Sequence, residues 1–285
     1  MYIDTLFDAA PPSAEPGLTF TANQGPNVLA PKGAYLDHFE MSLFADVGTA
    51  TVLETAINFM TQFTFKAGQE TRIQLGVNDL IALMAAFYKQ NPKVSPDGSL
   101  SNVFVFSIKI PVQETIQQGT TYTWAANYTA VANVTVNKMA LQAVYFNSAP
   151  AGAKPVIAVP TSWTTPASTG VTSINARFQN LGDVVGLLIF NTTQISGASD
   201  VADIQRIQLV ESGKQTSLLL AANGERLIGT GVYGSLDPLA ELLHPYDYWS
   251  FDAEPLNAAD GYIELQADVE TVSEATRIIP IILKH

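Results

Sequence analysis

Cysteine is absent from the 285 residues of this chain. A disulfide framework, a thiolate nucleophile and a thiolate metal site are therefore excluded. Long apolar runs are also missing, because the longest such stretch, residues 80–88, is far shorter than the about 20 residues that span a bilayer. Residues 1–8 lack the basic start and apolar core of a signal peptide. We expect a soluble protein made in the cytoplasm, unless it is exported without a leader of its own.

Charge is scarce and unbalanced. Charged residues make up only 14% of the chain, against about 25% in ordinary globular proteins. Low charge is expected of a surface that neighbouring subunits bury, because interface cores are depleted in charge. A neutral polar surface, as in many β proteins, is the alternative. The net charge of −12 and the lack of any Lys/Arg block argue against direct nucleic-acid binding, which depends on cationic contacts to phosphate.

The stretch from residue 57 to the proline at residue 92 changes from a strand pattern to a helix pattern. Apolar and polar residues alternate over residues 57–66, with Met60 as the one departure, and a second alternating segment follows a turn. From Asn78 or Asp79, either of which can cap a helix, the apolar spacing becomes helical. The residues at helical spacing are Leu80, Leu83, Met84 and Phe87. We therefore expect two strands followed by a short helix.

Strand patterns separated by turns every ~8–12 residues fill the rest of the chain, which is typical of a sandwich or barrel. In the first half they lie at residues 18–20, 35–44, 104–110, 122–128, 134–136 and 139–145. In the second half they lie at residues 184–190, 204–209, 217–222, 248–251, 263–269 and 277–283. A second short helix is expected at residues 238–243, with Asp237 at its cap and Pro238 at its first position.

The composition divides the chain into four parts. Residues 1–16 contain three prolines and no periodic pattern, so we expect an extended arm that is ordered only against a partner. Residues 148–172 are rich in Pro, Ala, Ser, Thr and Gly and are expected to be a linker, with a possible short strand at residues 156–159. Residues 17–147 and 173–285 then form two β units with the same order of elements, a set of strands, one short helix and closing strands.

No motif in the sequence predicts catalysis or a cofactor site. Residues 229–234 match G-x-G-x-x-G, but a dinucleotide site needs a βαβ unit around this motif, and none is present. No serine lies in G-x-S-x-G, and the three histidines are His38, His244 and His285. His38 and Glu40 would share a strand face, but a lone histidine beside carboxylates is usually a solvated surface group. We therefore expect no catalytic, cofactor-binding or metal-ligating residues.

Two other activities remain open alternatives. Paired carboxylates such as Asp247 with Asp252, or the group Glu264, Asp268 and Glu270, could hydrolyse glycosides, although a polar strand face or a loop explains them equally well. Exposed aromatic side chains could stack on sugars, as in a glycan-binding module. Trp124 and Trp249 lie in strand patterns and are expected in a core or interface, whereas Trp163 lies in the linker.

This arrangement resembles the double jelly-roll major capsid proteins of tailless, membrane-containing icosahedral viruses of bacteria and archaea. The segments that look closest to the small corticovirus-like version are residues 203–209 with the turn at residues 213–214, and residues 248–252, 262–267 and 278–283. The resemblance covers residues 17–285. It implies an all-β fold of two consecutive jelly-roll sandwiches, each with a short helix in a connection.

The same resemblance implies a structural role in a virion. The chain would form homotrimers that act as pseudo-hexagonal capsomers and tile a shell around an internal membrane. Its partners would be other copies of itself and neighbouring capsomers, with minor capsid proteins and the membrane as possible contacts of the arm at residues 1–16. A glycan-binding jelly-roll module, lectin-like or part of a spike, is the alternative function.

Overall fold

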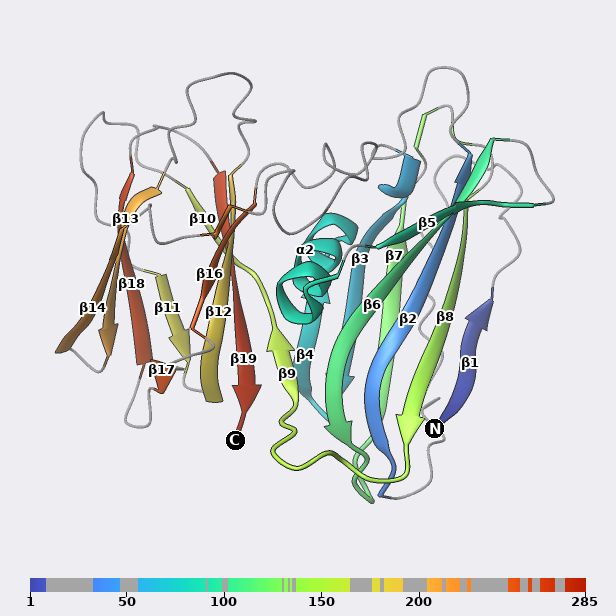
Figure 1. Ribbon diagram of the computed structural model, residues 1–285, viewed down its shortest axis with the longest axis horizontal. Coiled ribbons are helices and arrows are strands. Elements are labelled where there is room, and N and C mark those ends of the chain that lie inside the picture. The colour runs from blue at the N-terminus through green and yellow to red at the C-terminus, as the bar shows by residue number, and fades with distance from the viewer. Residues whose placement is uncertain are drawn as a thin grey trace.

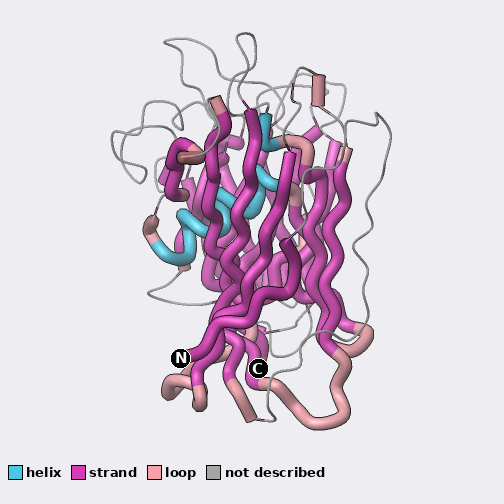
Figure 2. Tube along the Cα trace, turned by 90° about the vertical axis from the view of Figure 1, so that its right-hand side faces the viewer, coloured by secondary structure: helices cyan, strands magenta, loops and turns pink. Residues whose placement is uncertain are grey.

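The fold was analysed in a computed structural model (Figure 1). It describes residues 1–8, 33–46, 56–90, 92–98, 102–129, 131–132, 134, 137–164, 176–179, 182–191, 204–211, 214–220, 225–226, 246–251, 256–257, 262–269 and 275–285. In these residues the chain forms two β-sandwiches that stand side by side with their strands upright (Figure 1). Viewed from the side of the first sandwich, the strands are aligned along the long direction of the molecule (Figure 2). The all-β expectation is confirmed.

The first sandwich consists of two facing sheets. The outer sheet has the strand order β1-β8-β2-β6-β5. Its strands are β1 (Tyr2–Asp8), β2 (Tyr35–Asp46), β5 (Lys93–Pro96), β6 (Val103–Thr115) and β8 (Asn137–Phe146). The facing sheet contains β3 (Met60–Ala67), β4 (Glu70–Leu75) and β7 (Tyr122–Tyr128). Alternating apolar residues of the two sheets meet in the core, where the Phe39 ring lies 5.8 Å from that of Phe63 and 5.1 Å from that of Phe65.

The departure at Met60 has a structural cause. Strand β3 pairs Met60 with Tyr128 and Gln62 with Asn127, so Thr61 is an extra residue opposite β7. Such a bulge shifts the alternation by one residue. As a result Phe59 and Met60 are both buried, whereas Thr61, which the alternation had placed on the inner side, is exposed.

The expected first helix is confirmed as α2 (Val77–Tyr88). Its cap residue is Gly76, whose N–H donates to the Asp79 carboxylate at 3.2 Å. More of this helix is buried than the predicted stripe of apolar residues indicates. Ile81, Ala82, Ala85 and Ala86, which lie outside the stripe, are buried as well. A helix that is buried on all sides packs against more than one element.

The second sandwich also has two sheets. One continues the facing sheet of the first sandwich and contains β15 (Glu225–Arg226), β16 (Tyr246–Ser250), β12 (Gly182–Asn191) and β19 (Ala275–Lys284), in that order. Two short strands, β10 (Thr161–Thr164) and β17 (Leu256–Asn257), pair with β19 and β12. The other sheet has the order β11-β18-β13-β14, formed by β11 (Ala176–Gln179), β18 (Tyr262–Val269), β13 (Ile204–Glu211) and β14 (Lys214–Leu220).

Strand β9 (Val156–Ala158) joins the two sandwiches into one sheet. It pairs antiparallel with β19 of the second sandwich and parallel with β4 of the first, with Ala158 opposite both Ile281 and Ile73. The result is a single sheet of 10 strands that runs through both sandwiches. The short strand expected at residues 156–159 is therefore confirmed, and the segment expected to be a linker holds the two halves together.

The expectation for residues 1–16 is wrong for Tyr2–Asp8. These residues were expected to be ordered only against a partner, but they form β1 and pair antiparallel with β8 of the same chain. The Tyr2 ring stacks on Tyr145 at 4.8 Å and helps to hold the strand against β8. The three prolines of residues 11–16 led to the expectation of an arm, but they lie after this strand. The second expected helix, at residues 238–243, lies outside the described residues, as does the glycine motif at residues 229–234.

Candidate functional site

The histidine singled out in the sequence is a buried structural residue. His38 is only 6% exposed, so the expectation that it lies in solvent is wrong. Its Nδ1 lies 2.6 Å from Asp37 and its Nε2 lies 3.5 Å from Glu40. The register of β2 shifts between Leu36 and His38, and the imidazole lies 6.4 Å from the Tyr88 ring in a T-shaped arrangement. Among the residues described here, no three His, Asp or Glu side chains come together as a metal site.

The described carboxylates among those considered for glycoside hydrolysis lie on two strands of different sheets. Glu264 and Asp268 lie on β18, where they are in register with Val210 and Arg206 of β13. Asp247 lies on β16, opposite Ile189 of β12. Asp252 and Glu270 lie outside the described residues. Glu264, Asp268 and Asp247 are therefore regular members of paired strands.

The tryptophans differ in their positions. Trp124 on β7 is 4% exposed and belongs to the core, as expected. Trp249 lies within β16, in register with Leu187. Trp163 lies on β10, in register with Thr276 of β19. The residue considered for sugar stacking is therefore part of a strand pair at the edge of the junction between the sandwiches.

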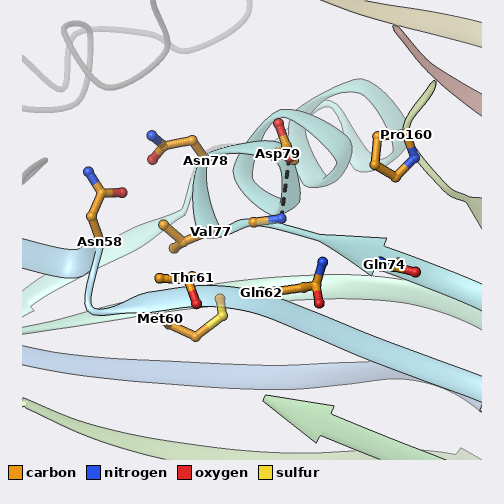
Figure 3. Close-up of a pocket in the computed structure, with 10 residues that line it drawn as sticks. Asn58, Met60, Thr61, Gln62, Gln74, Val77, Asn78, Asp79 and Pro160 are labelled. Atoms are coloured by element: carbon orange, nitrogen blue, oxygen red, sulfur yellow. Dashed lines mark hydrogen bonds between the residues drawn. The ribbon is translucent and has the colours of Figure 1, made fainter. Parts of the chain in front are cut away.

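A polar depression of about 400 Å³ lies beside the start of α2 (Figure 3). Its lining includes the amide side chains of Asn58, Gln62, Gln74 and Asn78. Asp79 is the one carboxylate among the lining residues, and it accepts the hydrogen bond from the Gly76 N–H. Neutral amides can hydrogen-bond a polar group, but they supply neither a nucleophile nor a general base. The four amides of the depression therefore offer hydrogen bonds to a polar group.

A network of four charges crosses the junction between the sandwiches. Arg72 Nη1 on β4 lies 2.7 Å from Glu70, and its Nε lies 3.3 Å from Glu114 on β6. Lys284 on β19 lies 2.5 Å from Glu70 and so brings the second sandwich into the network. Arg72 and Glu114 are 6% and 4% exposed. Two positive and two negative groups balance in this network, which is the condition under which buried charges are tolerated.

Burial raises the pKa of Glu114, and the nearby cations Arg72 and Lys284 oppose this shift. The sequence carries one indication of this site, in the spacing of residues on β6. Ile108, Ile110, Val112 and Glu114 follow one another at a spacing of two on β6, and all four are buried. A carboxylate at an inward-facing position requires a cationic partner. The identity of the partner, Arg72, depends on the pairing of distant strands.

A second cluster of charges joins the connection between the sandwiches to the second sandwich. Asp183 on β12 accepts hydrogen bonds from Lys154 at 2.6 Å and from His285 at 2.8 Å. The hydrogen bond from Lys154 holds the pKa of Asp183 below its ordinary value. The N–H of Lys284 also donates to the carbonyl of Pro155 at 2.8 Å. The connection between the sandwiches is therefore fixed to β12 and β19 by side chains and backbone.

Helix α2 fills the space between the sandwiches (Figure 1). It contacts β3 and β6 of the first sandwich and β12 of the second. At its end, the Nζ atom of Lys89 lies 4.6 Å from the centre of the Tyr248 ring on β16. One hydrophobic cluster includes residues of the helix, of the first sandwich and of the second, such as Leu188, Tyr248 and Ile279. The helix therefore closes one sandwich and seats it against the other.

None of the described helices is both long and apolar enough to cross a membrane. No protein-family model and no curated protein sequence matches the chain.

Solved structures of viral capsid proteins do match the fold of the whole chain. The major capsid protein of Sulfolobus turreted icosahedral virus is 14% identical, with a TM-score of 0.63 over 99% of this chain and 96% of that chain. The major capsid protein of bacteriophage PM2 is 12% identical, with a TM-score of 0.57 over 100% and 98% of the two chains. The capsid model of the virus PBCV-1 is 11% identical, with a TM-score of 0.56 over 98% and 92%.

These matches extend over both sandwiches and over nearly the full length of each capsid protein. They confirm the fold class that the resemblance in the sequence implied. The chain has the double jelly-roll fold that is found in the major capsid proteins of icosahedral viruses.

Proposed function

We propose that this chain is the major capsid protein of an icosahedral virus and acts by self-assembly, without catalysis. The observation that carries the proposal is the pairing of two upright sandwiches within one chain, through β9, α2 and a common core. Three such chains supply six upright sandwiches, so a homotrimer would have a pseudo-hexagonal outline. Capsomers of this outline would tile a shell over an internal membrane.

The composition supports the same role. Only 14% of residues are charged, as expected of a surface that neighbouring copies cover. The net charge of −12 disfavours direct contact with a nucleic-acid genome. In the proposal the protein is made in the host cytoplasm and resides in the virion, where its partners are other copies, minor capsid proteins and the membrane. The division into sandwiches at residues 17–147 and 173–285, joined by residues 148–172, belongs to this proposal.

The glycan-binding alternative lacks a comparable observation. Trp124 is buried, and Trp163 lies in a strand pair of the junction. The residues that line the depression beside α2 include amides but no aromatic ring on which a sugar could stack.

Light scattering and electron microscopy of the purified chain test the proposal. We expect a particle with three times the 30.6 kDa mass of the chain, and images of hexagonal outline with six upright density features. A protein that stays monomeric at high concentration would contradict it. Glycan binding that is lost in Trp163→Ala, in a protein that does not assemble, would favour the alternative instead.

A further inference from the structure

Strand β1 lies at the edge of the outer sheet and is paired on one side. In the order β1-β8-β2-β6-β5 it is the first strand, and β8 is its partner among the strands that the structure describes. If β1 left, β8 would become an edge strand with unpaired backbone N–H and C=O groups, and such an edge readily accepts a strand from another chain. In an exchange between copies, β1 would therefore be the donated strand, and the edge of β8 would be the site that accepts it.

Three side-chain contacts join β1 to β8, and Tyr2 and Leu6 also pack against the hydrophobic core. The Tyr2 ring stacks on Tyr145 at 4.8 Å. Gln142 Nε2 lies 3.5 Å from Thr5 Oγ1, and Lys138 Nζ lies 2.6 Å from Asp8. These three contacts fix one register along the strand, because they fall at its start, middle and end. An identical β1 from a second copy would make every one of them.

The connection from β1 to β2 is much longer than pairing within one chain requires. Asp8 lies opposite Ala140 and Tyr35 lies opposite Phe146, on the two sides of β8. Six residues along a strand and two strand spacings across correspond to roughly 22 Å, which about seven extended residues can span. Residues 9–34 separate the two strands, and about 26 residues reach up to roughly 85 Å when extended. This length allows β1 to reach β8 of a neighbouring copy.

Two large apolar side chains at the start of the chain favour that neighbouring position. Met1 and Ile3 are 75% and 49% exposed, and they are the large hydrophobic residues left exposed in the described part of the chain. Pairing within one chain leaves both of them in water. Pairing across a boundary between copies would place them where the next copy can cover them, which is favourable in proportion to the apolar area removed from water.

We infer that β1 of one copy pairs with β8 of a neighbouring copy in the assembled oligomer, in the register Thr5 opposite Gln142. The inference depends on the proposed function only in that several copies must assemble. Strand exchange of this kind keeps all the contacts of the closed monomer and adds a physical tie between copies. It is the donor strand, together with Met1 and Ile3, that recognises the second copy.

Cysteine cross-linking gives a sharp test, because the chain has no cysteine of its own. One preparation carries Thr5→Cys alone, a second carries Gln142→Cys alone, and the two are co-expressed so that they assemble together. A disulfide between these positions can then form only between chains. Thr5 and Gln142 lie directly opposite each other in the antiparallel register, which places their Cβ atoms about 4.5–5.5 Å apart, so a small adjustment of the strands allows a disulfide. After mild oxidation, we expect a band at twice the chain mass on a non-reducing denaturing gel, which neither single variant gives alone.

A double variant in one chain completes the design. Thr5→Cys with Gln142→Cys is expected to link whole oligomers, whereas the control Ser42→Cys with Ala140→Cys, which pairs β2 with β8, should link only within the chain. An oligomer in which Thr5→Cys with Gln142→Cys links only within the chain would overturn strand exchange and leave the proposed function intact. A protein that remains monomeric would overturn both.

Discussion

The Nζ atom of Lys284, in the closing strand of the second sandwich, lies 2.5 Å from a carboxylate oxygen of Glu70 in the first. Through Glu70 it is connected to Arg72, and through Arg72 to the buried Glu114. Four charges from three strands thus form one network at the junction. Because the interior hydrates charge poorly, removing one member leaves another without compensation.

The strongest expected effect in this network comes from Arg72. We expect Arg72→Met to lower the free energy of unfolding by about 3–5 kcal/mol, because it leaves the Glu114 carboxylate buried and unpaired. Urea denaturation followed by circular dichroism measures this change. Lys66→Met, at an exposed position of the neighbouring strand β3, is the control and should change stability by no more than about 0.5 kcal/mol.

Adding Glu114→Gln to Arg72→Met should restore much of the lost stability, because the double variant no longer buries an unpaired charge. If the double variant were as unstable as the sum of the two single variants, the pair would not be coupled and this account of the network would be wrong.

The pH dependence of stability should carry a contribution from Glu114. Burial raises the pKa of its carboxyl above the ordinary value of 4.5, so the folded state holds this proton to a higher pH than the unfolded state does. The resulting stabilisation is fully present below about pH 4.5 and is lost as the pH rises through the folded-state pKa. We expect Glu114→Gln to lose less stability than the unmodified protein between about pH 4.5 and 7. Equal slopes in urea titrations across this range would contradict the prediction.

Gly182 on β12 lies directly against the backbone of β19. A Cβ atom at this position would lie 2.1 Å from the carbonyl oxygen of Leu283, a contact that the paired backbones must shift to relieve. We expect Gly182→Ala to lower the free energy of unfolding by roughly 1–3 kcal/mol, as overpacking commonly does. Gly98→Ala is the matched control, since a Cβ atom there would meet nothing within 4 Å. Similar stabilities of the two variants in urea would refute the close approach.

The two sandwiches should unfold together. One hydrophobic cluster includes Phe63 and Leu83 of the first half and Leu188 and Ile279 of the second, so neither half can lose its core alone. Trp163→Phe/Trp249→Phe leaves Trp124 as the fluorescent reporter of the first half, and Trp124→Phe/Trp163→Phe leaves Trp249 for the second. Each variant is followed by fluorescence and by circular dichroism in urea. We expect the two probes to give one midpoint in each variant, whereas separate midpoints would show two independent units.

The sequence predicted those features that depend on local pattern. Alternation located β6 and β18, and the change to helical spacing located the start of α2 within one or two residues. The overall division into two β units followed from the order of elements. These features are local because a strand or a helix displays its periodicity in its own residues.

The features that could not be predicted from local sequence patterns depend on contacts between residues far apart in the chain. Glu70 meets Lys284 across 214 positions, and nothing near either residue indicates the other. The extra residue Thr61 in β3 becomes visible only against its partner β7. The sequence predicts an unpaired arm where β1 lies, because the partner strand β8 lies more than 130 residues further on. The depression beside α2 combines side chains of the bulged strand with those of the helix start, so no sequence motif marks it.

The position of β9 between β4 and β19 has a consequence for folding during synthesis. When β9 leaves the ribosome its partner β4 is already present, but β19 begins only at Ala275. At about 5–20 residues per second, the more than 110 intervening residues take roughly 6–24 s to synthesise. Throughout this interval the first sandwich presents an unpaired strand edge, where a second nascent chain can pair in place of β19. The speed of translation over the second half therefore sets how long each new subunit is exposed to misassembly.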